Sequence, residues 1–416
     1  MYYGWVVVAA LSVIAGVSTA MGGANYGFFI TPMQQDLGIS QFVFGTANTL
    51  RFTMLGVSSM WIGRLLDKYG SRWALMVAGT LTGMLCVSLA FVQAGWHMLL
   101  VFGAAGLIGM FGPTMLYTTV PVAKWFVLKR GRAMSLVFVG APAGIGLSTV
   151  ATQWLIAEFG WRQTWLILGS VSGVIVVLLA FLFVRRRPED MGLLPDGLTQ
   201  EEGASQQAAR RARGGSVEEH QWTRAEAWRS PIFWRLAIAF GLVLFGTGTM
   251  GLFRIPHFLG RGIDPGIVAL GTFGDAAAAA IVGMMIGPAV ERYSPRLVAL
   301  LGFGGMICAF LLTFVARDAT LMFVSSAFYG MGMATVMMLQ NVLWPNYFGR
   351  ANVGAIRGAA FPITLALQAL GAPLSGFIHD ATGTYLVAWW IALGFIIPAT
   401  VLIVTTRKPT RRAAPV

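Results

Sequence analysis

The sequence predicts an all-α membrane protein with twelve transmembrane helices. Of its 416 residues, 56% are hydrophobic and 11% are charged, and the mean hydropathy is +0.72. A hydrocarbon layer of roughly 30 Å needs about 20 apolar residues per spanning helix. Helices are expected because a spanning segment must satisfy its own backbone hydrogen bonds, and the apolar runs are too long for barrel strands. The expected spans are residues 5–30, 41–65, 73–93, 97–122, 133–156, 163–184, 232–258, 266–290, 297–316, 319–343, 354–378 and 385–405.

The first run, residues 5–30, is expected to be a retained helix rather than a cleaved signal peptide. No Lys or Arg precedes Arg51, and no small-residue cleavage site ends the run. Residues 21–25, MGGAN, are glycine-rich but are expected to lie inside this apolar helix. A phosphate-binding loop is therefore not expected there.

The distribution of basic residues predicts the orientation. With the N-terminus inside, 23 of the 29 Lys and Arg lie on the cytoplasmic side. Three lie outside, namely Arg162, Arg261 and Arg317. The other three lie within helices, namely Arg51, Arg254 and Arg357. This positive-inside pattern places both termini in the cytoplasm of an inner-membrane protein, and it explains the net charge of +13 without nucleic acid.

A hydrophilic stretch at residues 185–230 separates six expected helices from six. The predicted organisation is an N-terminal bundle at 1–184, a cytoplasmic linker at 185–230 and a C-terminal bundle at 231–416. The linker is expected to be solvated, with binding of its basic clusters to anionic lipid headgroups as the alternative.

The two halves are internal repeats. Residues 63–72, GRLLDKYGSR, match residues 287–296, GPAVERYSPR, at an offset of 224. The pair Trp125-Phe126 matches residues 347–348 at an offset of 222, as Cys86 matches Cys308. Two six-helix repeats of like orientation follow.

Residues 63–72 resemble the signature loop of the major facilitator superfamily. The resemblance implies a fold of two pseudo-symmetric six-helix bundles and a role in transport. In that family the acidic residue of this loop clasps basic residues and helix termini at the cytoplasmic face, which latches the outward-facing state. The resemblance therefore implies a cytoplasmic gate of Asp67, Arg64, Lys68 and Arg72, with a weaker second copy at Glu291 and Arg292.

Three further segments resemble a narrower group, the monocarboxylate transporters and their oxalate/formate antiporter relatives. They are residues 3–7, YGWVV, residues 124–133, KWFVLKRGRA, and residues 140–146, GAPAGIG. The resemblance implies a secondary transporter that moves a small organic anion by alternating access, with coupling to protons or by exchange.

Arg51 and Asp275 are expected inside the membrane, where a charge is costly and usually functional. Each lies sixteen residues before the acidic residue of its signature loop, so the two hold equivalent positions in helices 2 and 8. We expect Arg51 to bind the substrate carboxylate with its planar fork and Asp275 to accept a proton. The alternative is a structural ion pair.

The chain departs from the family on helix 8. Monocarboxylate transporters carry an Asp and an Arg four residues apart there, whereas Asp275 is followed by Ala279. The basic residues of the oxalate/formate relatives align with Gly283 and Pro362. Arg51 is therefore the expected replacement for the missing positive charge.

Other polar residues complete the expected site. Arg254 and His257 lie one turn apart near the external end of helix 7 and are candidates for proton coupling; alternatively Arg254 snorkels to the outer interface and His257 is wet. Arg357, near the start of helix 11, is assigned to the cytoplasmic gate. Substrate contacts are expected from Asn25, Tyr26, Asn48, Tyr117 and Asn341, each with an interhelical hydrogen bond as the alternative.

No nucleotide loop, zinc spacing or nucleophile elbow is present, so neither an enzyme nor a cofactor or metal is expected. The expected partners are a small carboxylate, protons and the lipid bilayer, and the protein is expected to be monomeric. The rival interpretations are a drug or cation exporter, a passive facilitator and a membrane sensor.

Overall fold

The computed structural model describes residues 2–22, 25–110, 115–126, 129–197, 222–349 and 352–406. Every regular element in these ranges is a helix. Eight of the helices are long and apolar enough to cross a membrane, and one of them, Arg132–Phe183, contains two of the expected spans. The chain divides into an N-terminal unit, residues 1–216 with 265–276, and a C-terminal unit, residues 217–264 with 277–416.

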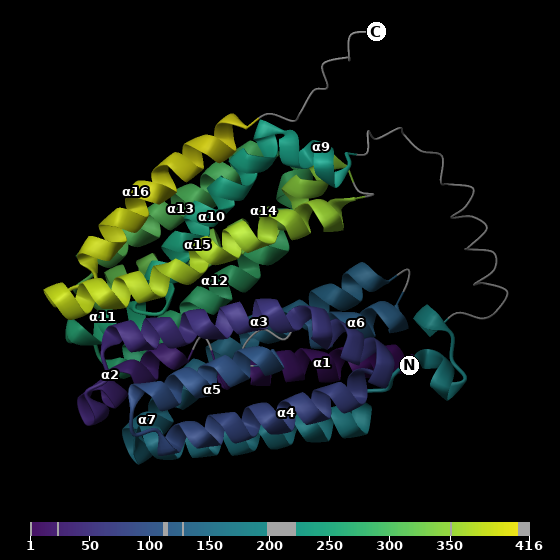
Figure 1. Ribbon diagram of the computed structural model, residues 1–416, viewed down its shortest axis with the longest axis horizontal. Helices are drawn as coiled ribbons and strands as arrows, with labels where there is room; N and C mark the ends of the chain where they lie inside the picture. The colour runs from purple at the N-terminus through teal and green to yellow at the C-terminus, as the bar shows by residue number, and fades with distance from the viewer. Residues whose placement is uncertain are drawn as a thin grey trace, which may run out of the picture. The chain divides into compact units, whose positions relative to one another are not determined.

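The N-terminal unit holds the first six expected spans in seven α-helices (Figure 1). The longest helix, α7, packs along both α1 and α4. Two short 3-10 helices follow α7. The bounds are α1 Tyr3–Ala20, α2 Tyr26–Leu37, α3 Gln41–Tyr69, α4 Ser71–Ser88, η1 Leu89–Phe91, α5 Gly95–Ile108, α6 Met115–Trp125, α7 Arg130–Phe183, η2 Pro188–Met191 and η3 Pro195–Gly197.

The helix α7 bends sharply at Gly160, between the fifth and sixth expected spans. Gly160 has φ +77°, a left-handed conformation that glycine adopts without steric cost. Asp36, at the end of α2, accepts a hydrogen bond from Trp161 Nε1 at 3.2 Å and pairs with Arg162. The bend is thus tied to the end of the first span.

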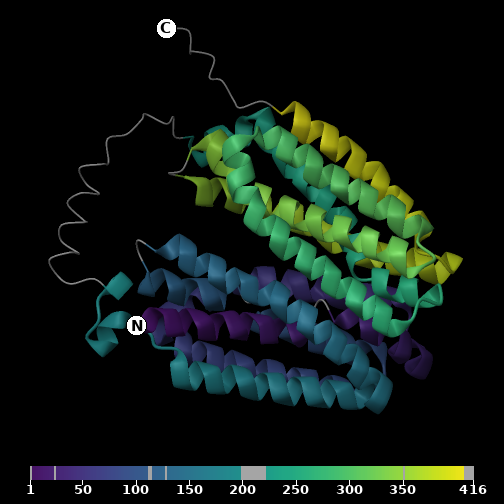
Figure 2. The same ribbon diagram turned by 180° about the vertical axis from the view of Figure 1, so that it is seen from behind.

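The C-terminal unit holds the remaining spans, with α12 divided between the two units after Ala276. In it α10 packs along α15 and α16, and α13 packs along α14 (Figure 2). The bounds are α9 Arg224–Arg229, α10 Pro231–Gly251, α11 Arg254–Gly260, α12 Pro265–Arg292, α13 Pro295–Val315, α14 Ala319–Phe348, α15 Val353–Thr382 and α16 Leu386–Thr405.

Three of the expected spans are broken rather than continuous. The first is interrupted between α1 and α2, the fourth between α5 and α6, and the seventh between α10 and α11. The expectation that residues 21–25 lie inside one helix is therefore wrong for Met21, Gly22 and Asn25, which lie in neither helix, while residues 23–24 lie outside the described residues. Gly22 and Gly109 stand at the first two interruptions, and Gly109 ends α5 with φ +75°.

Side chains satisfy carbonyl groups that the breaks release, which a bilayer cannot hydrate. In the fourth span the hydroxyl of Tyr117 donates to the carbonyl oxygen of Ile108 at 2.7 Å. In the seventh span the carbonyl oxygen of Thr249 accepts from Ser375 Oγ at 2.8 Å and from Trp389 Nε1 at 3.1 Å. The interruptions are therefore built into the fold.

Glycine seams hold equivalent helix pairs together in the two units. A Cβ on Gly144 of α7 would overlap the backbone of Gly16 of α1. In the C-terminal unit a Cβ on Gly371 of α15 would lie 2.6 Å from the carbonyl oxygen of Phe245 and 2.7 Å from the carbonyl carbon of Gly248, both in α10. Since α1 and α10 open the two repeats, the same close contact recurs in each half.

The chain after α7 does not run directly into solvent. The hydroxyl of Tyr2 lies 3.1 Å from the carbonyl oxygens of Trp125 and Leu194, and Lys129 N–H donates to Asp196 at 3.0 Å. Burial raises the pKa of Tyr2 to about 12, with a further contribution from Asp196, so its hydroxyl remains a donor at neutral pH. Residues 185–197 of the expected linker are thus folded against the N-terminal unit.

Candidate functional site

Arg51 is buried in the middle of α3, with 4% of its surface exposed. Its Nη2 donates to Asn48 Oδ1 at 2.9 Å, one turn earlier on the same helix, and its guanidinium lies 4.5 Å from the ring centroid of Phe52. Gly106 of α5 packs against the Arg51 backbone so closely that a Cβ there would overlap the Arg51 carbonyl oxygen. The structure therefore brings together Arg51 and Asn48 as expected.

Asn25 and Tyr26 are consecutive residues at the break of the first span. Tyr26 is 1% exposed and lies near Arg51, and its hydroxyl is 3.2 Å from the Met98 sulfur. Asn25 is fully buried, and its Oδ1 accepts a hydrogen bond from Ser148 Oγ at 3.4 Å. Two of the expected substrate contacts thus take part in packing between helices.

Tyr117 is also buried, with 6% of its surface exposed. Its hydroxyl proton is engaged by the Ile108 carbonyl, so in this arrangement the phenol can accept a hydrogen bond from a ligand but does not donate one to it. A contact between Tyr117 and the substrate remains a prediction. The structure shows that Tyr117 also bridges the break in the fourth span by its bond to Ile108.

Arg254 and His257 are both buried, with 3% and 9% of their surface exposed, so the alternative of a snorkelling Arg254 and a wet His257 is wrong. The short helix α11 turns both residues into the C-terminal unit. Arg254 Nη2 is 3.2 Å from both Ser325 Oγ and Ser326 Oγ of α14. The His257 ring makes an edge-to-face contact with Trp389, with centroids 4.7 Å apart.

Two residues assigned to different roles contact each other. Arg357 Nη1, expected at the gate, donates to Asn341 Oδ1, expected at the substrate, at 2.5 Å. Asn341 Nδ2 in turn donates to the Met337 carbonyl oxygen at 3.2 Å. Asp275 is partly buried on α12, and its pairing with Arg51 remains a prediction.

The signature loop lies where α3 ends and α4 begins. Arg64 and Lys68 are exposed, as is Arg292 of the second copy, while Arg72 lies 4.7 Å from the ring centroid of Phe181 of α7. Arg186 Nη2 donates to the Lys68 carbonyl oxygen at 3.5 Å. The side chains of Asp67 and Glu291 lie outside the described residues, so the latch remains a prediction.

A family comparison decides the class of protein. The model of the Major Facilitator Superfamily matches residues 12–361 and 255–416. The chain belongs to the major facilitator superfamily. It is therefore a multi-pass membrane transporter of twelve helices in two pseudo-symmetric bundles, not an enzyme.

The similar curated members of the superfamily include transporters of carboxylates. Human monocarboxylate transporter 11 is 24% identical over 95% of this chain and 81% of its own length, and human monocarboxylate transporter 2 is 23% identical over 96% and 84%. The gallate transporter of Pseudomonas putida is 24% identical over 84% of this chain and 83% of its own length.

Solved structures of the superfamily show the same fold. The nucleoside transporter NupG has a TM-score of 0.71 at 16% identity and covers 99% of this chain and 100% of its own. A bacterial homologue of the human lysosomal transporter Spinster, in an inward-facing and unoccupied conformation, has a TM-score of 0.70 at 16% identity, with 98% and 99% covered.

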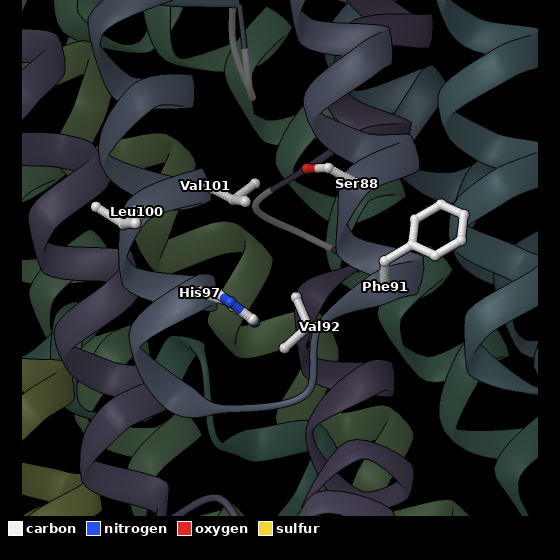
Figure 3. Close-up of a pocket in the computed structure, with 6 residues that line it drawn as sticks. All are labelled: Ser88, Phe91, Val92, His97, Leu100 and Val101. Atoms are coloured by element: carbon white, nitrogen blue, oxygen red, sulfur yellow. The ribbon is translucent and has the colours of Figure 1, made fainter.

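One open pocket of about 240 Å³ lies elsewhere in this transporter (Figure 3). It is lined by Ser88, Phe91, Val92, His97, Leu100 and Val101, from the end of α4, η1 and α5. Its lining includes none of the expected site residues, and Phe91 is 68% exposed. We assign it to the surface rather than to transport.

Sequence reasoning missed the partners of Arg254. Ser325, Ser326 and the half-buried Tyr329 stand on α14 about 70 residues further along the chain, and the Arg254 guanidinium lies 4.5 Å from the Tyr329 ring centroid. A pair of adjacent hydroxyl residues in an apolar span was the available signal, because such residues usually bind another helix or a ligand.

Proposed function

We propose that this transporter moves a small carboxylate across the inner membrane by alternating access, coupled to protons. The observation that carries the proposal is Arg51, a buried guanidinium oriented by Asn48 inside an apolar helix. The names of the relatives support the class of substrate, because monocarboxylates and gallate both present a carboxylate to the protein.

Arg51 suits a carboxylate because its planar fork offers two parallel N–H donors and stays protonated when buried. Asn48 fixes the direction of that fork. Asn25, Tyr26 and Asn341 are proposed to supply further polar contacts around a substrate whose remaining surface is apolar. Tyr117 is proposed to join them as a donor once its hydroxyl leaves the Ile108 carbonyl. A small anion with one carboxylate and a compact apolar or aromatic body fits this chemistry.

Proton coupling is assigned to Asp275, with His257 and Arg254 as further participants. Protonation of Asp275 removes a negative charge that competes with the substrate for Arg51. The proton and the anion then favour each other's binding, and by linkage each does so equally. Reorientation with both sites filled or both empty gives symport, since a ligand shifts an equilibrium only by its differential affinity for the two states.

Asp67, Arg64, Lys68, Arg72, Glu291, Arg292 and Arg357 are proposed to form the cytoplasmic gate. Charged contacts near helix ends can break and form again as the two bundles rock. Both termini are proposed to lie in the cytoplasm, and the working form is proposed to be the monomer.

The test is uptake of radiolabelled acetate, benzoate, gallate and succinate into proteoliposomes, with and without an inward proton gradient. The wild type, Arg51→Gln and the control Arg235→Gln are compared, because Arg235 is exposed on α10. Loss of charge-assisted hydrogen bonds predicts that uptake by Arg51→Gln falls by about 30-fold or more, while the control is unchanged.

Uptake of none of these anions by the wild type would contradict the proposed substrate class and would direct the search to cations. Equal uptake by Arg51→Gln and the wild type would show that Arg51 is structural. A flux that ignores the gradient would leave a carboxylate facilitator or exchanger without proton coupling. With Asp275→Asn we expect exchange to persist and stimulation by the gradient to disappear.

A further inference from the structure

Two histidines from distant parts of the chain lie around one tyrosine in the C-terminal unit. Tyr385, between α15 and α16, stacks on the His379 ring with centroids 4.2 Å apart, and the His257 ring of α11 meets it edge-on at 6.3 Å. Tyr385 and His257 are buried, whereas His379, in the last turn of α15, is half-buried. We call these three residues the Tyr385 cluster. In the proposed orientation, with both termini in the cytoplasm, it lies at the external end.

Each histidine has one buried ring nitrogen without a partner among the described residues. His257 hydrogen bonds to the backbone of Thr313, and the nitrogen left over is its Nε2. In His379 the corresponding atom is Nδ1. Buried polar atoms without a partner are rare and mark the place of a water, a ligand or a proton. Packing on Tyr385 alone would be served as well by phenylalanine, which carries no such nitrogen.

Aromatic rings enclose the cluster on its inner side. Phe253 and Trp389 stack on Tyr385, with centroids 5.1 and 5.6 Å away, and both are fully buried. Trp389 also meets the His257 ring at 4.7 Å, while its indole N–H donates to the Thr249 carbonyl oxygen. The rings that surround His257 therefore offer no hydrogen bond to its Nε2, and they leave that atom as a bare proton acceptor.

The charged groups nearby differ between the two histidines. Asp380, which is exposed and next in sequence, lies near the His379 ring. The charged or titratable groups near His257 are Arg254, Arg261 and His379. A negative neighbour stabilises a proton on an imidazole, and positive neighbours oppose one. A proton from the solvent is therefore received more readily at His379 than at His257.

We infer that the Tyr385 cluster takes up the coupled proton from the external side, with His379 as the entry group and His257 as the inner group. The inference rests on the proposed proton coupling and adds His379 to the residues that carry it. Hydronium protonates His379 and leaves as water. The imidazolium then gives up the proton on its buried Nδ1 to the Nε2 lone pair of His257 and is neutral again. One proton enters the pair, and one proton moves inward.

The first experiment follows the histidine rings directly, because this readout does not depend on transport. The chain contains four histidines, so nitrogen-15 NMR of the histidine-labelled protein in nanodiscs can follow each ring from about pH 4 to 8. His257→Phe and His379→Phe assign the two signals, and each keeps an aromatic ring for packing. His97→Phe is the matched control, since His97 is half-buried with its ring 3.7 Å from that of Trp96.

We expect His379 to titrate in this range and the titration curve of His257 to be displaced in His379→Phe. Neighbouring sites that exchange a proton titrate as a pair, so removal of the outer ring changes the inner one. The His97→Phe control should leave both curves unchanged.

The second experiment measures benzoate uptake into proteoliposomes. We expect His379→Phe to reduce the stimulation by an inward proton gradient by about 5-fold. Benzoate exchange without a gradient should stay within about 2-fold of the wild type, and His97→Phe should change neither flux. His379→Gln is expected to lose the same stimulation, and it replaces the phenylalanine variant if that variant misfolds.

A His379 ring that does not titrate, or a His257 curve that is the same in His379→Phe, would overturn the inference. Gradient stimulation that survives in His379→Phe would also overturn it and would leave the proposed function intact, as would an equal loss in His97→Phe. Absence of carboxylate uptake in the wild type would overturn the proposed function instead. Coupled titration of the two rings would then still uphold the proton pair, and independent titration would overturn it.

Discussion

Arg51 and Arg254 are buried to nearly the same degree, yet they are held in different ways. Arg51 donates to Asn48, three residues earlier on the same helix, whereas Arg254 donates to serines 71 and 72 residues away on another helix. The hydrogen bond between Arg51 and Asn48 needs only α3 to form. The hydrogen bonds from Arg254 to the two serines need α11 and α14 to have packed.

Both arginines also lie beside an interrupted span. Gly106, close to the end of α5, packs on the Arg51 backbone, and Gly251 at the end of α10 packs on the Tyr329 hydroxyl that accompanies Arg254. Gly106 faces rigid backbone, whereas Gly251 faces the tip of the Tyr329 side chain. The two sites should therefore respond differently to the same change.

The largest expected effect is from Gly106→Ala compared with Gly251→Ala. A Cβ on Gly106 would meet the Arg51 backbone and lie 2.8 Å from Met54 Cβ, neither of which can yield cheaply. We expect Gly106→Ala to lower the free energy of unfolding by about 2–3 kcal/mol and Gly251→Ala by less than about 1 kcal/mol. Thermal unfolding of the purified variants measures both, and equal losses would contradict the distinction.

Removal of one hydrogen-bond partner tests how each guanidinium is oriented. Asn48→Ala removes the side-chain acceptor from Arg51 Nη2, so we expect about a 10-fold rise in the KM for a carboxylate. Ser326→Ala leaves Ser325 in place, and we expect a rise of about 2-fold or less. Uptake kinetics of the two variants would refute the comparison if Ser326→Ala proved the more damaging.

The aromatic faces provide a third comparison. The guanidinium of Arg254 and that of Arg51 each lie 4.5 Å from a ring centroid, that of Tyr329 and that of Phe52 respectively. Cation–π contacts of this kind contribute about 0.5–2 kcal/mol.

We therefore expect Tyr329→Leu to lower the free energy of unfolding by about 1 kcal/mol and Tyr329→Phe to lower it by less. Thermal unfolding of the purified variants is the measurement, and Phe52→Leu is the matched change beside Arg51. A loss in Tyr329→Phe as large as that in Tyr329→Leu would show that the hydroxyl matters more than the ring.

The smallest expected effects concern the carbonyls released at the breaks. Tyr117→Phe removes the hydroxyl that donates to the Ile108 carbonyl, which should cost about 1 kcal/mol of unfolding free energy. Ser375→Ala should cost less, because Trp389 still donates to the Thr249 carbonyl. Thermal unfolding compares the two, and a larger loss in Ser375→Ala would contradict this ranking.

The sequence alone could predict the features of this protein that local geometry determines. The fold class followed from apolar runs of spanning length, and the bond between Asn48 and Arg51 follows from a spacing of three on one helix. The contact of Arg254 with Ser325 and Ser326 could not be predicted, because spacing along the chain says nothing about which faces of two distant helices meet.

The broken spans were missed for a related reason. Hydropathy measures transfer to lipid and is nearly blind to backbone conformation, so a run such as residues 5–30 reads as one helix whether or not it is interrupted. Gly22 and Gly109 were visible signals, yet glycine is also common in continuous transmembrane helices. What decides between an interrupted and a continuous helix is a side-chain donor that can satisfy a released carbonyl, nine residues away for Tyr117 and 140 residues away for Trp389.

The contact of Tyr2 with Trp125 and Leu194 has a practical consequence for handling the protein. Because Tyr2 is inserted between the end of α6 and the segment after α7, an affinity tag or fluorescent fusion joined directly to residue 1 would crowd this contact. Measurements on such a fusion would report a perturbed end of the N-terminal unit. Labels belong at the other end of the chain, or behind a flexible spacer long enough to leave Tyr2 in place.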